Sequence, residues 1–113
     1  MKKYLFLDDI RDPKDDLPWH IVRTYDEAIL WMSTHGCPNV LALDHDLGMK
    51  LVGTKLVTDD YNALNGIDVV LWIIAKDVEM KRTFIPKDFI YTIHSSNPTG
   101  SQNMDRAFKE YLL

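Results

Sequence analysis

Short apolar runs alternate along the chain with longer stretches in which apolar residues recur at helical spacing. The short runs predict four strands, at Lys3–Leu7, His20–Arg23, Val40–Leu43 and Phe89–Ile93. The longer stretches predict three helices: one from Thr24 to Gly36, one at Gly66–Lys76 and one from about Thr99 to Tyr111. At the first of these, Thr24 and Glu27 fit a capping box, and Gly36 is expected to end the helix. This alternation predicts a small α/β three-layer sandwich, with a mainly parallel sheet of about four strands covered on both faces.

The stretch from Gly48 to Asn65 is long for a connection in a domain of this size, and such loops are usually functional or mobile. Within it, the letters KLV occur twice on either side of Gly53-Thr54, which predicts a small hairpin. We therefore expect a single domain over residues 1–113 with an inserted hairpin or lid at 49–64. Lys50 and Lys55 on that hairpin either close over an anionic ligand or only solvate the surface.

Polar residues follow three of the predicted strands directly. Asp8 and Asp9 follow the first run, and Asp44, His45 and Asp46 follow the run at Val40–Leu43. The last run ends in His94, Ser95, Ser96 and Asn97. If these strands are parallel, their carboxyl ends share one edge of the sheet, where ligands bind in open α/β folds. The sequence thus predicts one site built from residues that are distant along the chain.

The carboxylates Asp8, Asp9, Asp44 and Asp46 predict a divalent metal site. Clustered carboxylates resist ionising together unless a cation neutralises them. Oxygen ligands suit hard ions, so Mg²⁺ or Mn²⁺ is expected. The structural alternative is that these aspartates form turns or cap helices.

His45 and His94 are candidate general acids or bases for opening a phosphodiester, because imidazole exchanges a proton near pH 7. They could instead be metal ligands, or histidines that are bonded to loop carbonyls. His20 and His35 lack polar company and are taken as structural or surface residues.

Arg11 and the segment from His94 to Asn103 are candidates for gripping phosphate. Arg11 lies three residues after Asp8, although it could equally pair with the nearby acidic residues. Ser95, Ser96 and Asn97 precede a helix whose N-terminus offers free backbone N–H groups. Helix capping by Asn97 would explain the same pattern.

Composition narrows the choice of function. The chain has 113 residues with a net charge of −4, which argues against binding along extended duplex DNA but allows a nucleotide or one RNA end. No apolar run is long enough to span a membrane or to form a secretory signal, and the single cysteine, Cys37, fits a reducing compartment. We therefore expect a cytoplasmic protein. The P-loop and dinucleotide-binding glycine motifs are absent from the sequence.

Four segments resemble a known family, the cyclic-phosphate-processing receiver-like domains. They are Leu5–Pro13, Leu43–Gly48, Gly66–Trp72, and His94–Pro98 followed by Asn103-Met104. The resemblance implies a receiver-like Rossmannoid fold and a role in handling cyclic phosphates in RNA repair or nucleotide conflict systems, including phage copies. Asp44 matches the phosphate acceptor of ordinary receivers. The lysine that ordinary receivers place after their last strand is replaced by His94-Ser95-Ser96, and the first inter-strand helix is missing, which argues against signalling by phosphotransfer.

The residues and the resemblance together predict a metal-dependent phosphoesterase, a hydrolase acting on a cyclic nucleotide or on an RNA end with a 2′,3′-cyclic phosphate. Asp8, Asp9 and Asp44 would hold the metal with help from Asp46, and His94 and His45 would move protons. Two alternatives stay open: a receiver-like module that binds a nucleotide or protein without catalysis, and a receiver that is phosphorylated on aspartate.

Overall fold

The computed structural model describes residues 1–47, 49–52, 55–58 and 64–113. Its elements, in chain order, are β1 (Tyr4–Leu7), β2 (Trp19–Val22), α1 (Tyr25–His35), β3 (Val40–Leu43), β4 (Met49–Val52), β5 (Lys55–Thr58), α2 (Gly66–Glu79), β6 (Ile90–Ile93) and α3 (Pro98–Leu112). The predicted order of strands and helices is confirmed, with boundaries that differ by at most three residues. Within the segment where a hairpin was expected, β4 and β5 pair as antiparallel strands.

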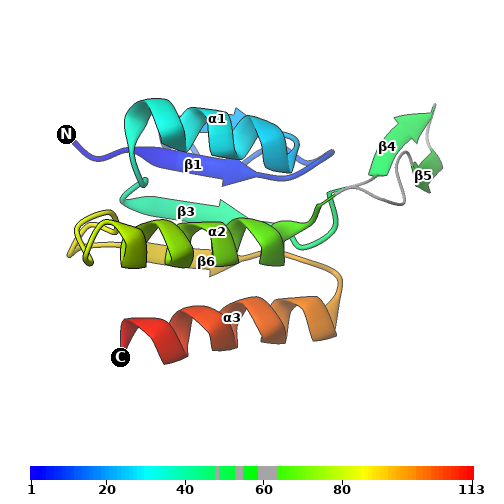
Figure 1. Ribbon diagram of the computed structural model, residues 1–113. Coiled ribbons are helices and arrows are strands. Elements are labelled where there is room, and N and C mark those ends of the chain that lie inside the picture. Colours follow the sequence, from blue (N-terminus) through cyan, green and yellow to red (C-terminus); the bar gives the residue numbers. More distant parts are fainter. Residues whose placement is uncertain (48, 53–54, 59–63) are drawn as a thin grey trace.

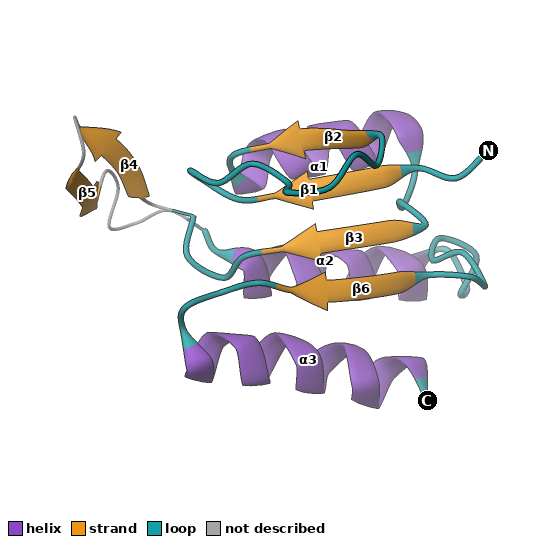
Figure 2. Cartoon of the chain, turned by 180° about the vertical axis from the view of Figure 1, so that it is seen from behind, coloured by secondary structure: helices purple, strands orange, loops and turns teal. Residues whose placement is uncertain are grey.

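The four main strands form one parallel sheet in the order β2-β1-β3-β6 (Figure 1). Their carboxyl ends therefore lie along one edge, as the sequence predicted. A four-stranded parallel sheet with three helices is the small receiver-like α/β fold expected from the sequence. The hairpin of β4 and β5 lies beyond this edge (Figures 1 and 2).

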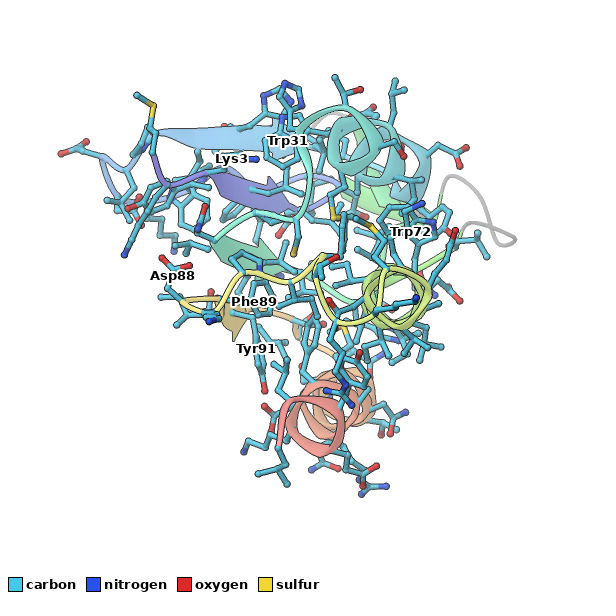
Figure 3. The ribbon with its side chains drawn as sticks, turned by 60° about the vertical axis from the view of Figure 1, so that its left-hand side comes forward. Lys3, Trp31, Trp72, Asp88, Phe89 and Tyr91 are labelled. Carbon is cyan, nitrogen blue, oxygen red and sulfur yellow. The ribbon has the colours of Figure 1, made fainter. Side chains whose placement is uncertain are left out.

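The helices do not cover both faces of the sheet, which differs from the predicted three-layer sandwich. Helices α1 and α2 pack on one face and α3 lies beside the β6 edge against α2 (Figures 2 and 3). Steps from β2 to β3 and from β3 to β6 run in the same direction across the sheet. Right-handed connections therefore place both intervening helices on the same face. The connection from β1 to β2 contains Pro13 and Pro18 and forms no helix that could cover the other face.

The core lies between the sheet and this single helical layer. It contains buried leucines of β1 and β3, aliphatic residues of α2 and two side chains of α3: Leu5, Leu7, Leu41, Leu43, Val69, Val70, Ile73, Met104 and Phe108. On the other face, Phe6 is covered by Trp19, whose ring meets it edge-on at 5.8 Å. Ile90, on the edge strand, is 58% exposed. The second face thus has an aromatic cover near β1 and is open at β6.

Several termini form as their sequences predict. Thr24 Oγ1 accepts a hydrogen bond from the N–H of Glu27. Glu27 Oε1 accepts in turn from Arg23 N, one residue earlier than a standard capping box. Gly36 ends α1 at a φ of 87°, in the left-handed region that glycine adopts without strain. Asn65 is the N-cap of α2, and its N–H donates to Asp68 Oδ2.

Candidate active site

Residues after β1, β3 and β6 converge at the carboxyl edge of the sheet. Backbone pairing continues past the strands: Asp44 N donates to Leu7 O at 2.9 Å, and His94 N donates to Leu43 O at 3.1 Å. As a result, one carboxylate oxygen from each of Asp8, Asp9 and Asp44 lies within 4.8 Å of the others. The predicted convergence of residues from the first and middle strands is therefore present in the structure.

Asp8 is fully buried and strongly hydrogen-bonded. Its Oδ1 accepts from the N–H groups of Ile10 and Arg11, at 3.0 and 2.8 Å. Its Oδ2 lies 3.0 Å from Nε2 of His94. Since a carboxylate offers about four acceptor positions, roughly one is left for another partner. Asp8 thus shapes the turn after β1 and orients the histidine from β6.

Asp44 is 6% exposed, and its Oδ1 accepts from the N–H of His45 at 2.8 Å. Burial raises the pKa of the Asp44 carboxyl group, and a hydrogen bond from Ser95 opposes that rise. The negative charge of Asp8 raises the pKa further, while Arg11 lowers it. Asp44 is therefore a buried acid whose ionised form is not fully compensated by the protein.

His94 is held by a ring stack as well as by Asp8. Its ring lies 4.7 Å from that of Phe6 at an interplanar angle of 12°. Burial lowers the pKa of His94, whereas the charges of Asp8 and Asp44 raise it. With Nε2 directed to Asp8, the remaining ring nitrogen is Nδ1, and the imidazole has a fixed orientation beside the carboxylates.

Two arginines secure the loop that borders the site. The exposed Arg11 donates from Nη1 to the carbonyl oxygen of His94 at 2.7 Å. Arg23, at the end of β2, donates to the carbonyl oxygens of Asp8 and Arg11 and pairs with Asp12. The sequence analysis did not single out Arg23, although it ends the predicted strand His20–Arg23 and so belongs to the same sheet edge.

The other predicted residues form a second, neighbouring group. His45 Nδ1 lies 2.9 Å from Asp46 Oδ1, and Asn97 Nδ2 lies 3.4 Å from the same oxygen. Asn97 Oδ1 also caps α3 by accepting from Gly100 N, so the predicted capping role is present. Asp46 is not among the three carboxylates that lie within 4.8 Å of one another. Ser96 is exposed at the turn before α3.

Two glycines allow α2 and α3 to approach Asp44 and His45 closely. A Cβ at Gly66 would lie 2.1 Å from the carbonyl oxygen of Asp44. A Cβ at Gly100 would lie 2.4 Å from Cγ of His45. The imidazole of His45 is thus packed against α3, which favours a positioning role over direct contact with substrate. Apart from a glycine early in each helix, no feature of the sequence predicts these contacts.

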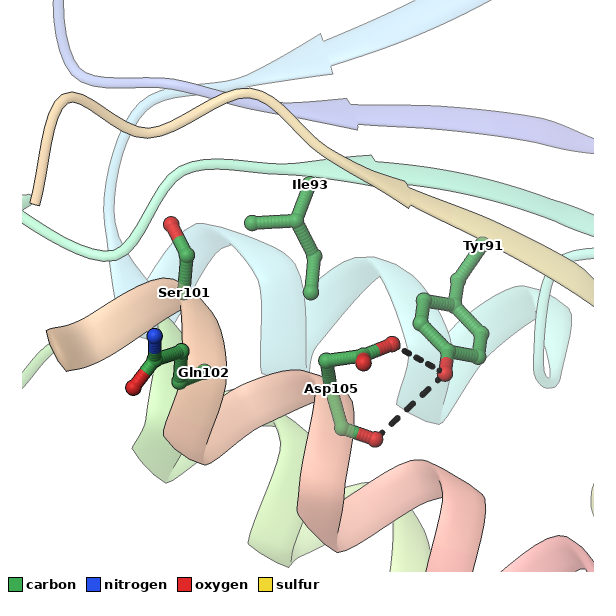
Figure 4. A pocket seen from close by; sticks show the side chains of 5 residues that line it. All are labelled: Tyr91, Ile93, Ser101, Gln102 and Asp105. Atoms are coloured by element: carbon green, nitrogen blue, oxygen red, sulfur yellow. Dashed lines mark hydrogen bonds between the residues drawn. The ribbon is translucent and has the colours of Figure 1, made fainter. Parts of the chain in front are cut away.

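Two hollows occur elsewhere on the described surface, and neither is lined by Asp8, Asp9 or Asp44. One, of about 380 Å³, lies between β6 and α3 and is lined by Tyr91, Ile93, Ser101, Gln102 and Asp105 (Figure 4). In it, Tyr91 donates its hydroxyl proton to Asp105 Oδ1 at 2.8 Å, and burial together with this bond raises the pKa of Tyr91 to about 12. The other, of about 330 Å³, lies between β2 and α1.

Comparison with protein families identifies the chain. A model of the cyclic-phosphate processing receiver domain matches residues 3–110 of the 113-residue chain. The chain belongs to this family. No curated protein and no solved structure matches it. Among the described residues of this receiver domain, no helix is both long and apolar enough to cross a membrane.

Proposed function

We propose that this receiver domain is a metal-dependent phosphoesterase that opens a cyclic phosphate. The substrate would be a cyclic nucleotide or an RNA end carrying a 2′,3′-cyclic phosphate. The observation that carries the proposal is the meeting of three carboxylates, with His94 fixed to one of them. Family membership supports the association with cyclic phosphates.

The donor set fits a hard divalent cation. Asp8, Asp9 and Asp44 offer only carboxylate oxygens, which suits Mg²⁺ or Mn²⁺ better than softer metals. The raised pKa of Asp44 has a cause that a cation would remove, namely burial beside the negative charge of Asp8. When bound, the ion would supply positive charge to polarise the phosphate. Asp46 would assist from the neighbouring group through its bond to His45.

In the proposed reaction, water attacks phosphorus and one ester P–O bond of the ring breaks. The water gives up a proton, the departing sugar oxygen takes one, and the product is a phosphomonoester beside a free hydroxyl group. His94 would take or give the proton through Nδ1, because its Nε2 is bonded to Asp8. His45 would keep Asp46 in place rather than act on substrate.

The phosphate would lie against groups that already border the carboxylates. Arg11 is exposed and has four further N–H donors beyond the one directed to His94 O. Ser95 contacts Asp44, and Ser96 and Asn97 lie at the N-terminus of α3, whose dipole favours anions. The exposure of Arg11 and the positions of Ser95, Ser96 and Asn97 support their predicted role in binding phosphate.

The test is hydrolysis of 2′,3′-cyclic AMP, 3′,5′-cyclic AMP and a short RNA with a 2′,3′-cyclic end, each with Mg²⁺, Mn²⁺ or EDTA. We expect turnover of at least one substrate with a metal and none with EDTA. His94→Gln should reduce turnover by about a hundredfold or more, as loss of a general acid or base does. Asp44→Asn should abolish turnover and also the rise in melting temperature that the metal gives.

Glu110→Gln is a matched control, because it removes one negative charge from an exposed position near the far end of α3. It should behave like the unchanged protein. Tight binding of a cyclic phosphate without turnover would instead support a non-catalytic module. A mass increase of one phosphoryl group after treatment with acetyl phosphate would support aspartyl phosphorylation.

A further inference from the structure

The free edge formed by β2 and α1 exposes apolar side chains around a hollow. The hollow of about 330 Å³ is lined by residues of both elements, among them Ile21, Leu30 and Trp31. Leu30 is 70% exposed, and Ile21, whose side chain lies on the same face of the sheet as Phe6, is 38% exposed. By contrast, three of the five residues that line the hollow at the opposite edge are polar, namely Ser101, Gln102 and Asp105, beside Tyr91 and Ile93. The β2 edge is therefore the one where covering the surface removes apolar area from water.

The middle of β2 lies directly beside the middle of α1. The rings of His20 and Trp31 stack with centroids 5.6 Å apart. His20 is the second of four residues in β2, and Trp31 is near the centre of the eleven-residue α1. A single two-fold axis can therefore pass close to the centres of both β2 and α1. With such an axis, β2 can pair with β2 of a second copy while α1 packs against its α1 in the same symmetric interface.

The backbone of Ile21 faces the open edge of the sheet. The carbonyl oxygen of Val22 accepts from Asp8 N, so that residue's backbone groups point toward β1. Backbone groups alternate in direction along a strand, so those of Ile21 point away from β1. The next outward N–H, that of Arg23, is already bound by Glu27. The edge thus offers one N–H and one C=O at its centre, enough for one reciprocal pair with an antiparallel strand.

The outward stripe of α1 is complementary to its own reversed copy. Glu27, Leu30, Trp31 and Thr34 line the hollow at helical spacing, and His35 follows at the carboxyl end. Reversing a second copy about the centre of the helix places Leu30 near its counterpart and Glu27 near Thr34 and His35. A parallel arrangement would instead place Glu27 against Glu27. Charge therefore favours the antiparallel, two-fold arrangement.

We propose that two copies of this chain associate through this edge. Ile21 pairs with Ile21 of the second copy across antiparallel β2 strands, and the two α1 helices pack antiparallel through Leu30 and Trp31. The result is a continuous sheet of eight strands. Trp31 lies on the α1 side of the molecule in Figure 3, where the second helix would be seated.

Sedimentation velocity over a wide range of concentrations tests this proposal on the full chain. We expect a transition from a species of 13.1 kDa to one of twice that mass. Leu30→Glu should weaken the association by about a hundredfold, because it removes apolar contact and introduces facing negative charges. The matched control is Leu71→Glu, which alters a 51% exposed leucine on α2, away from this edge, and should leave the association unchanged.

Cross-linking tests the predicted symmetry independently. Cys37 is buried, so an introduced surface thiol should dominate oxidation. Leu30→Cys should give a disulfide-linked dimer on mild oxidation, formed from one thiol of each copy, whereas Leu71→Cys should not. A mass of 13.1 kDa at every concentration would overturn the proposal. Equal association of Leu30→Glu and the unchanged chain would overturn it too, with circular dichroism confirming that each variant is folded.

Discussion

Two buried aspartates, Asp44 and Asp77, lie near opposite ends of α2, and their pKa values are shifted in opposite directions. Asp44 adjoins the first residue of α2 through Gly66, and Asp77 lies eleven residues further along, about 16 Å away at the rise of an α-helix. Asp77 is 3% exposed and Asp44 is 6% exposed. Burial raises the pKa of both groups, but only in Asp77 do hydrogen bonds reverse the effect. Burial alone therefore does not identify a functional acid.

The hydrogen-bond partners explain the difference. Asp77 Oδ1 accepts from the N–H groups of Ile85 and Phe84, and its Oδ2 accepts from the hydroxyl of Tyr111. These bonds and the positive charge of Arg82 hold the pKa of Asp77 below its ordinary value of 3.8. Asp44 has a bond from His45 N and one from Ser95, but Asp8 and Asp9 are its neighbours. The bonds to Asp77 give it a structural role, whereas the uncompensated charge of Asp44 is what the proposed cation would neutralise.

The largest expected effect on stability comes from removing Asp77, the carboxylate whose hydrogen bonds are fully made within the protein. Asp77→Ala should lower the free energy of unfolding by about 4 kcal/mol, because two buried N–H groups and a hydroxyl lose their acceptor. The turn that contains Lys81 and Arg82, both at positive φ, should also lose its anchor. Urea denaturation followed by circular dichroism measures the change. A loss below 1 kcal/mol would show that Asp77 does not hold this end of the molecule together.

Removing the charge of Asp44 should change the free energy of unfolding by less than Asp77→Ala does, and should raise it rather than lower it. In EDTA, Asp44→Asn should raise the free energy of unfolding by an amount on the order of 1 kcal/mol, because it relieves repulsion among neighbouring carboxylates. With Mg²⁺ or Mn²⁺ in excess, the unchanged protein should gain about 2.7 kcal/mol at a hundred times the dissociation constant, and the variant should gain little. The comparison with Asp77 would fail if Asp44→Asn destabilised the metal-free protein.

These two regions also show how far the sequence could lead. The meeting of Asp8, Asp9 and Asp44 was predictable because parallel strands bring their carboxyl ends to one edge whatever the side-chain packing. The Asp77 cluster was not, since its partners come from a turn and from the far end of α3. For the same reason the sequence left both His45 and His94 as candidates for proton transfer or metal binding. The structure shows that the ring of His45 bonds to Asp46 and lies against Gly100 at the start of α3.

The fold was predicted with similar limits. Apolar runs located the four strands, but the helix Gly66–Lys76 in fact continues to Glu79, since no glycine or proline stops it earlier. Helices on both faces were expected from the alternation of elements. The single helical layer follows from the order of the strands, which the sequence pattern does not contain.

Removing a single hydrogen bond to Asp77 should separate the contribution of the Tyr111 hydroxyl from that of the two backbone N–H groups. Tyr111→Phe removes one bond to Oδ2 and leaves both backbone bonds to Oδ1. It should lower the melting temperature less than Asp77→Ala does, because the hydroxyl is the only donor lost and the ring keeps its contact with Arg82. Thermal unfolding measures this, with Tyr4→Phe as a control on a different face of the molecule. A loss as large as that of Asp77→Ala would mean that the hydroxyl bond, rather than the turn, dominates.

The pH dependence of stability should separate the two groups most finely, since titration only adds a proton and removes no atoms. The folded pKa of Asp77 is lowered, so the unfolded chain binds more protons just below pH 3.8, and stability from Asp77 is lost as pH falls through that window. The folded pKa of Asp44 is raised, so the folded chain binds more protons just above 3.8, and stability falls as pH rises through that second window.

Urea midpoints in EDTA measure this effect. As pH rises from about 4, the stability of Asp44→Asn should increase relative to that of the unchanged protein. His94, whose pKa is lowered from 6.5, gives a slope of the opposite sign nearer neutrality, so the decisive range is the acidic one. A constant difference between the two proteins across that range would show that the carboxyl group of Asp44 is already compensated within the protein, and the reason to expect a cation there would be lost.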